Sequence, residues 1–405
     1  MRRHPARHSS QPAFQTMNIL HLTPYYAPAW AYGGVPRAVE GLARALQRRG
    51  HDVTVLTSDA LAAGRRHPGP ADDLCDGVRV LRVANALPWL RDRFNLSTTL
   101  PVGTLARDLL PAMDVVHCHE LRTLENLLVT PRAQAAGLPL VLSPHGTLGH
   151  DTGRGRFKAL WDRAAGPGLA QRFNHVIALT EAEVAELRAL WNGDTPTSVI
   201  PNGIDPGEFA DLGDGASFRE TWRTGPGPLC LFMGRLHERK GLQALVEAFR
   251  MTQRPDARLV IAGPDEGMRA RLEPLQDGRL LFTGLLTGQG RLDALAAAAL
   301  LALPARGEGL PMAALEAMGA GLPLILAPGC NLPQAVTRGA ALEVPPQPAP
   351  LAQALERLLA DPSLRAEMGR QGRALVNECF TWERSAQRCE AVYRSLMTGQ
   401  QQPVL

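Results

Sequence analysis

The feature that most constrains the fold is a regular alternation of short apolar runs and helical patterns, which passes along the chain twice. Strands that are apolar throughout and alternate with helices are typical of a parallel sheet covered on both faces. In the first half the predicted strands are Asn18–Leu22, Val53–Thr57, Val78–Val83, Val115–His117, Pro139–Ser143 and Val176–Leu179. The predicted helices include Arg37–Arg49, Leu121–Ala136 and Glu181–Trp191.

The pattern restarts after a loop rich in Gly, Pro and Asp. The strands predicted there are Leu229–Met233, Arg258–Ala262, Leu280–Phe282, Leu300–Leu303 and Leu322–Ala327. The predicted helices are Gly241–Arg250, Met268–Leu275, Pro311–Met318, Leu351–Leu359, Leu364–Val376 and Trp382–Met397, with a linker at Pro345–Pro350. A length of 405 residues suits two domains. We therefore predict an α/β fold with two doubly wound, Rossmann-like domains, residues 17–194 and 195–378, facing a central cleft.

Composition excludes several protein classes. With 45% hydrophobic and 20% charged residues the chain is a globular protein, and a net charge of +4 with 5% aromatic residues does not indicate a nucleic-acid binder. No apolar stretch approaches the roughly 20 residues of a membrane span. The six cysteines form no CxxC pair, so a disulfide framework or a structural zinc site is not expected. This cysteine pattern suits a protein of the reducing cytoplasm. Residues 1–16 lack the apolar core of a signal peptide and are expected to be a disordered tail.

Several catalytic signatures are missing from the sequence. There is no GxGxxG after the first predicted strand, and there is no GxxxxGK(S/T), HExxH or GxSxG. These absences remove support for hydride transfer, P-loop hydrolysis, zinc proteases and α/β-hydrolases. The sequence also has no Asp-x-Asp pair of the kind that holds a metal–diphosphate.

The most informative stretch is Pro304–Pro323, PARGEGLPMAALEAMGAGLP. A strand ends before it, Pro311 fits the first turn of a helix, and Glu308 lies in the loop between them. Free amides at this helix start, over residues 309–312, can bind a diphosphate. From the spacing alone, it is equally consistent that Glu308 only caps the helix and Glu316 only faces solvent, with neither residue binding a ligand.

A second stretch, Gly234–Leu242 (GRLHERKGL), follows the first strand of the second domain. Gly234 permits a tight turn, and Arg235 and Lys240 then lie in the loop and at the next helix start. Both cations can reach the same phosphates, Arg as a planar fork and Lys as a point charge. Such a pattern usually means two solvated basic side chains. Lys240 is one of only two lysines in the chain, with Lys158, and its place between a strand and a helix weakens that simpler interpretation.

These motifs resemble those of the retaining, nucleotide-sugar-dependent glycosyltransferases of family 4 (group 1), which have the GT-B fold. The resemblance covers nearly the whole chain. Glu308 to Glu316 matches the E-x7-E motif of the family, and GRLHERKG matches its G-R-L-x-x-x-K-G loop. Further matching segments are the Gly33-Gly34 loop, Ser143–Leu148 (SPHGTL), Val199–Asp205 (VIPNGID), Ile261–Gly267 (IAGPDEG), Phe282–Leu286 (FTGLL) and Phe380–Leu396. The last of these implies that residues 379–405 form a helix crossing back to the first domain. Pro311-Met312 departs from the more common Phe-Gly, a change that fits a subgroup of the family.

The resemblance implies a role for each site residue. Glu308 hydrogen-bonds the donor-sugar hydroxyls, Glu316 holds the ribose, and His145 lies beside the sugar to orient it and stabilise charge. The expected diphosphate-binding residues are Gly33, Gly34, Arg235, Lys240, Gly309, Leu310 and Met312. The expected base-side loops contain Gly263, Pro264, Gly284 and Leu286.

The expected reaction is metal-independent transfer with retention of configuration, by front-side attack of the acceptor hydroxyl, with no cofactor besides the nucleotide sugar. Cations and oriented amides would stabilise the negative charge on the leaving phosphate. His117-Cys118-His119-Glu120 also suggests a metal cluster, because His117 and His119 face the same side of an extended segment. The sequence shows no further ligand for that cluster, and a structural or acceptor-side role is the preferred interpretation.

The acceptor is expected on the first domain, as a glycan or a lipid-linked precursor. Residues 1–185 carry 21 Lys and Arg against 15 Asp and Glu, and the remainder carries 22 against 24. Arg154–Arg163 and Pro88–Phe94 combine basic and apolar residues, which suits peripheral contact with the anionic inner face of the cell membrane. A surface helix with a packed apolar stripe is the simpler interpretation of both segments.

Two other functions fit the same architecture. A sugar-nucleotide epimerase would bind a nucleotide sugar between two domains but needs no acceptor surface, and the E-x7-E motif with GRLxxxKG speaks against it. A catalytically silent nucleotide-sugar-binding subunit is the second alternative. The intact set of Glu308, Glu316, Arg235, Lys240 and His145 speaks against that function.

Overall fold

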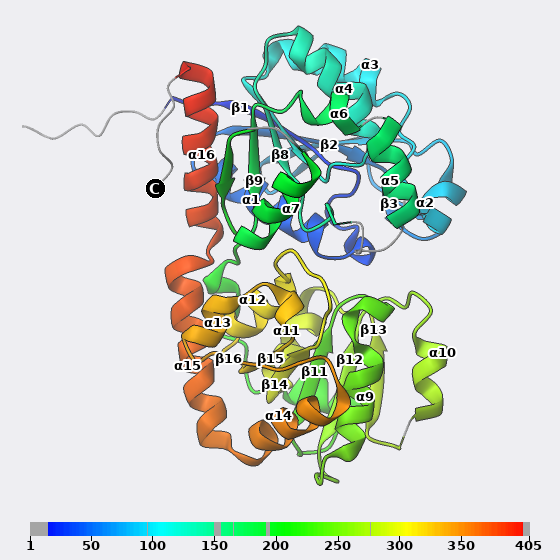
Figure 1. The fold of residues 1–405 in the computed structure, drawn as a ribbon, viewed down its shortest axis with the longest axis vertical. Coiled ribbons are helices and arrows are strands. Elements are labelled where there is room, and N and C mark those ends of the chain that lie inside the picture. Colours follow the sequence, from blue (N-terminus) through cyan, green and yellow to red (C-terminus); the bar gives the residue numbers. More distant parts are fainter. Residues whose placement is uncertain are drawn as a thin grey trace, which may run out of the picture.

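The computed structural model describes residues 15–94, 96–149, 155–164, 166–191, 195–275 and 277–399. It consists of two α/β domains stacked along the long axis of the molecule (Figure 1). The strands of each main sheet alternate with helices along the chain. This architecture confirms the predicted pair of Rossmann-like domains.

The sheet of the first domain contains eight strands among the described residues, and all of its pairings are parallel except that of its edge strand β5. In sheet order the strands are β10 (Thr197–Val199), β9 (His175–Ala178), β8 (Leu140–Ser143), β7 (Val115–His119), β1 (Asn18–Leu22), β2 (Asp52–Ser58), β6 (Val78–Val83) and β5 (Asp72–Cys75). A small ladder pairs β3 (Ala60–Ala62) with β4 (Arg65–Arg66). The helices are α1 (Gly34–Arg48), α2 (Pro88–Phe94), α3 (Val102–Leu109), α4 (Leu124–Ala135), α5 (Gly155–Ala164), α6 (Gly166–Ala170) and α7 (Glu181–Leu190).

The sheet of the second domain is wholly parallel over its described residues. In sheet order its strands are β13 (Leu280–Gly284), β12 (Arg258–Ala262), β11 (Leu229–Met233), β14 (Leu300–Leu303), β15 (Leu324–Leu326) and β16 (Ala341–Glu343). The helices that follow residue 215 are α8 (Ala216–Trp222), α9 (Leu242–Met251), α10 (Arg269–Leu272), α11 (Gly288–Ala297), α12 (Met312–Gly319), α13 (Pro333–Thr337), α14 (Pro348–Ala360), α15 (Pro362–Cys379) and α16 (Trp382–Thr398).

The central strands are buried because helices cover both faces of each sheet. Every residue of β7, β8, β11 from Leu229 to Phe232, and β14 is buried. This double burial explains why these strands are apolar along their whole length instead of alternating with polar residues. The few polar side chains on buried strands, the histidines of β1 and β7 among them, therefore need an explanation.

The domain boundary differs from the predicted one. Strand β10 pairs with β9 in register Thr197 to Val176, so the first domain continues through Val199 rather than ending at residue 194. Residues 192–194, where the boundary was predicted, lie outside the described part of the chain, as do residues 1–14 of the predicted tail. The short length of β10 explains why its apolar pattern does not stand out from the loop. The predicted linker at Pro345–Pro350 is also partly wrong, because α14 begins at Pro348.

The C-terminal helix α16 returns to the first domain, as predicted (Figure 1). It packs against α1, and Arg49 at the end of α1 donates a hydrogen bond of 2.7 Å to Glu390. Tyr393 of α16 is buried and its hydroxyl lies 2.7 Å from the Nδ1 of His117 on β7. The helix thus links the second domain, from which the chain enters it, to the first. Over the described residues, no helix is both long and apolar enough to cross a membrane.

Candidate active site

A cleft of about 970 Å³ lies between the domains and is lined by residues of both. The loops that line it follow the carboxyl ends of parallel strands, where ligands bind in open α/β sheets. The predicted site residues that line it are Gly33, Gly34, His145, Arg235, Lys240, Gly263, Pro264, Leu286, Glu308, Gly309, Leu310, Met312 and Glu316. The structure therefore brings together, from distant parts of the sequence, nearly every residue that the motifs indicated.

Gly284 is the exception, because it does not belong to the cleft wall formed by the described residues. Its carbonyl instead accepts a hydrogen bond of 2.8 Å from the amide of Gly263. At Gly263 a Cβ atom would lie only 1.8 Å from the carbonyl oxygen of Gly234. Gly284 thus supports a tight crossing of two loops rather than contacting the cleft itself.

The glycine loop of the first domain meets Arg235 of the second. Gly33 has a φ of 105°, in the region that favours glycine, and a Cβ atom there would lie 3.2 Å from the Nε of Arg235. A Cβ atom on Gly34 would lie 3.4 Å from the Cγ of Met312. Any side chain at position 33 would therefore crowd Arg235, and any side chain at position 34 would crowd Met312 at the start of α12.

Both predicted phosphate-binding cations are paired with carboxylates. Lys240 forms an ion pair with Glu308, and both side chains are largely buried. Arg235 donates a hydrogen bond of 2.8 Å to Glu266, and about a third of each of these side chains is exposed. Sequence reasoning missed Glu266, which lies in the matched IAGPDEG segment but has no distinguishing spacing.

The loop that carries Glu308 is fixed by contacts on both sides. The amide of Glu308 donates to the carbonyl of Gly329 at 2.8 Å, and Asn331 donates to the carbonyl of Glu308 at 2.6 Å. Asn331 has a φ of 52°, a conformation that Asn tolerates better than most residues. The loop is therefore held in place, and Gly309, Leu310 and Met312 at the start of α12 line the cleft.

Glu316 is buried rather than solvent-facing, which rules out the alternative interpretation of this residue. Its side chain is 7% exposed and lies 2.9 Å from the Nη1 of Arg291, which also pairs with Glu208. Arg291 comes from α11 and was not identified from the sequence. A buried carboxylate needs such a partner, because an unpaired charge in the interior is costly.

The backbones of the two domains approach each other closely at Gly146 and Gly309. A Cβ atom on Gly146 would lie 2.5 Å from the Cα of Gly309. The turn is held by Glu183, whose carboxylate accepts hydrogen bonds from the amides of Gly146 at 2.5 Å and Leu179 at 2.7 Å. Burial raises the pKa of Glu183 to about 7, although the two amide bonds oppose this shift.

His145 precedes this contact and has a φ of 58°, an uncommon conformation for a residue with a side chain. Strained conformations of this kind cluster at functional sites. Its Nε2 lies 2.9 Å from the Nδ1 of His119, and burial lowers the pKa of His145 to about 4. His145 is therefore neutral at physiological pH and belongs to a network of buried histidines.

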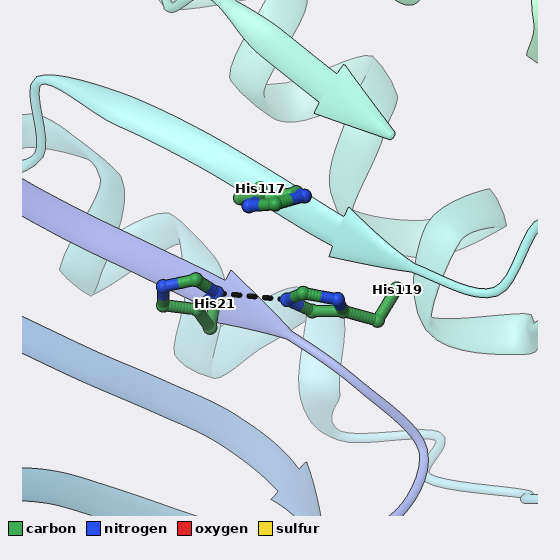
Figure 2. A group of neighbouring side chains, drawn as sticks. All are labelled: His21, His117 and His119. Carbon is green, nitrogen blue, oxygen red and sulfur yellow. Dashed lines mark hydrogen bonds between the residues drawn. The ribbon is translucent and has the colours of Figure 1, made fainter. Parts of the chain in front are cut away.

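The predicted metal interpretation of His117, Cys118, His119 and Glu120 is only partly reproduced. Cys118 lies on the other face of the sheet, in a separate apolar cluster. His21 of β1 joins His117 and His119 instead, and ligand atoms of these three lie within 4.8 Å of one another (Figure 2). However, the Nδ1 of His21 and the Nε2 of His119 lie 2.8 Å apart in a hydrogen bond, so the facing nitrogens are already used.

Glu120 lines the cleft, although the sequence singled it out only as a possible metal ligand beside His117 and His119. It follows β7, has a φ of 61°, and is half-buried. Burial raises the pKa of Glu120 to about 7, with Arg235 and Lys158 opposing the shift and Glu125 adding to it. The neighbouring strands β7 and β8 are thus each followed by a cleft residue with a positive φ, Glu120 and His145 respectively.

The two segments predicted to contact a membrane lie on the first domain. Pro88–Phe94 forms α2, where Trp89 is 60% exposed. Of the segment Arg154–Arg163, Arg154 lies outside the described residues, and the remainder forms α5. Leu160 on α5 is 66% exposed, which does not fit a fully packed apolar stripe. Arg122 anchors α5 through hydrogen bonds of 2.8 and 2.7 Å to Asp162.

Comparison with protein families matches both domains. Residues 32–208 match the model of glycosyltransferase family 4, and residues 217–375 match the model of glycosyl transferases group 1. A glycogen synthase of Mycobacterium tuberculosis is 28% identical over 413 residues, covering 96% of this chain and 97% of the relative. A GDP-mannose-dependent monoacylated alpha-(1-6)-phosphatidylinositol monomannoside mannosyltransferase of Corynebacterium glutamicum is 31% identical over 289 residues, covering 66% of this chain and 73% of the relative.

Two solved structures illustrate the fold that this chain shares. Sucrose-phosphate synthase of Thermosynechococcus elongatus aligns with a TM-score of 0.74 at 22% identity, covering 95% of this chain and 100% of that one. Anabaena HepE in complex with UDP-glucose aligns with a TM-score of 0.75 at 20% identity, covering 94% and 100%. These similarities show the GT-B fold.

Proposed function

Because the chain belongs to glycosyltransferase family 4, we propose that it transfers a hexosyl residue from a nucleoside-diphosphate sugar to a hydroxyl acceptor with retention of anomeric configuration. The family and the GT-B fold establish a nucleotide-sugar glycosyltransferase. Retention, the absence of a metal requirement and the chemical class of the acceptor are the proposed parts.

One observation carries the proposal: the cations of one domain meet the glycine loop of the other. Arg235 approaches Gly33 closely, and Lys240 lies in the same cleft, paired with Glu308. Cleavage of the bond between sugar and diphosphate places negative charge on the leaving phosphate. Two cations and the free amides at the start of α12 are suited to stabilise that charge without a metal ion.

Donor binding would exchange one anion for another at these cations. Glu266 and Glu308 hold Arg235 and Lys240 in position. A diphosphate carries more charge than a carboxylate and accepts the same hydrogen bonds, so it competes for both cations. Release of Glu308 from Lys240 would leave its carboxylate available for donor-sugar hydroxyls, the role expected from the family.

Glu316 and His145 have separate roles on this proposal. Glu316 is fixed by Arg291 deep in the cleft wall, where a rigid carboxylate suits the ribose hydroxyls. His145 lies across the cleft at the contact between Gly146 and Gly309, which supports the placement of the sugar beside it that the family suggests. Its neutral imidazole orients the sugar and interacts with developing charge. No carboxylate is assigned as a nucleophile, so the acceptor oxygen bonds directly to the anomeric carbon as the bond to the diphosphate breaks. The proton of the acceptor hydroxyl goes to the leaving phosphate oxygen.

The acceptor is proposed to be a glycan or lipid-linked precursor that binds the first domain from the cytoplasmic side. The names of several relatives describe such acceptors, for example the GDP-mannose:cellobiosyl-diphosphopolyprenol alpha-mannosyltransferase of Xanthomonas oryzae pv. oryzae, 30% identical over 76% of this chain. The exposed Trp89 and Leu160 lie on the same domain and support peripheral membrane contact.

The test is a donor screen followed by product analysis. UDP-, GDP- and ADP-sugars are screened for thermal stabilisation, since a ligand at 100 times its dissociation constant adds about 2.7 kcal/mol. Donors that bind are then incubated with and without lipid-linked and glycan acceptors. A glycosylated acceptor supports the proposal. An epimerised nucleotide sugar in the acceptor-free arm supports the epimerase, and binding without any product supports a silent subunit.

A further inference from the structure

We propose that His119 and His21 are positioning residues that hold His145 in its Nδ1–H tautomer, so that His145 offers a neutral hydrogen-bond donor to a substrate oxygen. The inference rests on the proposed transferase function only for the identity of that oxygen. The tautomer itself follows from the hydrogen bonds and the surroundings of three histidines, two of them fully buried and one half-buried.

The three rings form a continuous chain from the core to the cleft. The Nδ1 of His21 lies 2.8 Å from the Nε2 of His119, and the Nδ1 of His119 lies 2.9 Å from the Nε2 of His145. His21 and His119 are fully buried, whereas His145 is half-buried and lines the cleft. Figure 2 shows the rings of His21 and His119 meeting edge to edge.

His117 does not belong to this chain. Its Nδ1 lies 2.7 Å from the hydroxyl of Tyr393 and its Nε2 lies 2.8 Å from the hydroxyl of Ser143. Hydroxyl groups both donate and accept, so they satisfy either tautomer of His117. Its ring lies next to that of His119 without a hydrogen bond between them, with centroids 4.3 Å apart.

Burial keeps all three chain members neutral, because desolvation lowers the pKa of His21 to about 3 and of His145 to about 4, and that of His119 well below its usual value. A neutral imidazole carries one N–H. Each hydrogen bond in the chain joins an Nδ1 to an Nε2, so the three rings must share one tautomer. Either all three are protonated at Nδ1, or all three are protonated at Nε2.

The two ends of the chain decide between these states. The Nε2 of His21 and the Nδ1 of His145 are both buried without a hydrogen-bond partner among the described residues. In the Nε2–H state, the unpaired N–H would lie on His21 in the sheet interior, and a buried donor without a partner is costly. In the Nδ1–H state, the unpaired N–H lies on His145, where the Nδ1 is covered as well. His145, however, is a half-buried residue of the cleft wall, so a local rearrangement can bring water or a ligand to this donor, and the fully buried His21 has no such access.

The Nδ1–H state therefore places the free donor where a ligand can accept it. The Nδ1 of His145 is covered in this structure, so a substrate oxygen reaches it only after rearrangement at the contact between Gly146 and Gly309. A neutral N–H suits a hydroxyl or ring oxygen of the donor sugar, and it adds no positive charge beside a cationic transition state. The protein thus fixes the tautomer of a cleft histidine through its other nitrogen.

The direct test is the nitrogen-15 spectrum of the histidines in the full chain, recorded without any sugar. Long-range proton–nitrogen correlations distinguish Nδ1–H from Nε2–H rings. The signals are assigned with His21→Phe, His119→Phe and His145→Phe. Three Nδ1–H rings support the inference. Three Nε2–H rings, charged rings, or a stoichiometric metal ion on these nitrogens in elemental analysis of the purified protein would overturn it.

The functional test uses His119→Phe, which keeps the ring volume and breaks the chain. His145 is then expected to change to the Nε2–H tautomer that is commoner in water, with kcat lowered about 10- to 100-fold and donor KM within about twofold. His119→Gln is expected to restore much of the activity, because its amide accepts at one end and donates at the other. A folded His119→Phe variant with unchanged kcat and unchanged His145 signals contradicts the inference.

The matched control is His117→Gln, which removes an equally buried histidine from the same strand and the same face. The tautomer of His145 and kcat should be unchanged in this variant. If His117→Gln changes both as strongly as His119→Phe does, the effect reflects packing and the inference fails. A protein with three Nδ1–H rings but no transferase activity would instead refute the proposed function and leave the tautomer assignment standing.

Discussion

The ammonium group of Lys240 is ion-paired with the carboxylate of Glu308, although 68 residues separate them in the sequence. Lys240 follows β11 and Glu308 follows β14, and these two strands are neighbours in the sheet. The pair therefore joins the two motifs that are proposed to form the donor side of the cleft. A change in either residue leaves the other without its charged partner.

Replacement of Lys240 with alanine is expected to lower turnover by roughly 100-fold or more, because a cation that stabilises the leaving phosphate contributes most in the transition state. Steady-state kinetics with a saturating acceptor measure this. Arg271→Ala is the control, since Arg271 is an exposed cation on the same domain with a partner 3.9 Å away. Turnover of Lys240→Ala within a factor of two of the unmodified protein would reject the assignment.

The two glutamates of the motif are expected to fail differently. Glu308→Gln keeps the shape but removes a charge that the proposed mechanism places beside the reacting sugar, so kcat should fall much more than donor KM rises. Glu316→Gln should weaken the proposed hydrogen bonds to the ribose, which does not change during the reaction, so its main effect should be on donor KM. Circular dichroism melts must accompany both variants, because Glu316 also compensates the buried Arg291. The opposite pattern in two folded variants would show that the sugar and ribose positions are interchanged.

The backbone contact between the domains gives a steric prediction with an internal control. Gly146→Ala places a methyl group 2.5 Å from the Cα of Gly309, so the domains must move apart and kcat/KM should fall roughly 100-fold. Gly137→Ala has a similar positive φ of 72° but open space around it, so it should cost about 1 kcal/mol of stability and leave kcat/KM unchanged. Equal losses of activity in both variants would mean that backbone strain, not the contact, is responsible.

The location of the site was predictable because of how parallel sheets are built. Loops that follow parallel strands meet at one edge, so Arg235, Lys240 and Glu308 could be placed together from their positions after strands. The pairing partners could not be predicted. His21 contacts a residue 98 positions away, and its pairing depends on β1 lying next to β7 in the sheet order. The ion pair between Arg291 of α11 and Glu316 likewise depends on how the elements pack, which the sequence pattern does not reveal.

Stability should fall as the pH is lowered from about 7 towards 5. Burial lowers the pKa of His145 and His175 to about 4 and of His21 to about 3, and those of His117 and His119 well below 6.5. Below pH 6.5 the unfolded chain therefore binds protons that the folded chain does not, and folding is disfavoured. Each net proton contributes about 1.4 kcal/mol per pH unit.

Three carboxyl groups among the described residues act in the opposite direction, and Glu40, whose pKa is raised by burial, is one of them. The pKa values of Glu120 and Glu183 are raised to about 7, so the folded chain holds these protons between pH 4.5 and 7 and gains stability on acidification. The five histidines outnumber them, and the net effect is a loss. Thermal melts in buffers from about pH 7 to pH 5 measure it, with His175→Gln expected to reduce the acid sensitivity. A melting temperature that stays constant or rises on acidification would contradict this balance.

The most direct measurement is proton NMR of the transfer reaction in excess EDTA, with the donor found in the binding screen and its acceptor. The anomeric signal of the donor should disappear while a glycosidic signal of the same anomeric configuration appears, at a rate that EDTA leaves largely intact. Arg235 and Lys240 both line the cleft, and on the proposed mechanism they supply the positive charge that a metal would otherwise provide. A product of inverted configuration, or a reaction abolished by EDTA and restored by Mg²⁺ or Mn²⁺, would contradict the proposed mechanism.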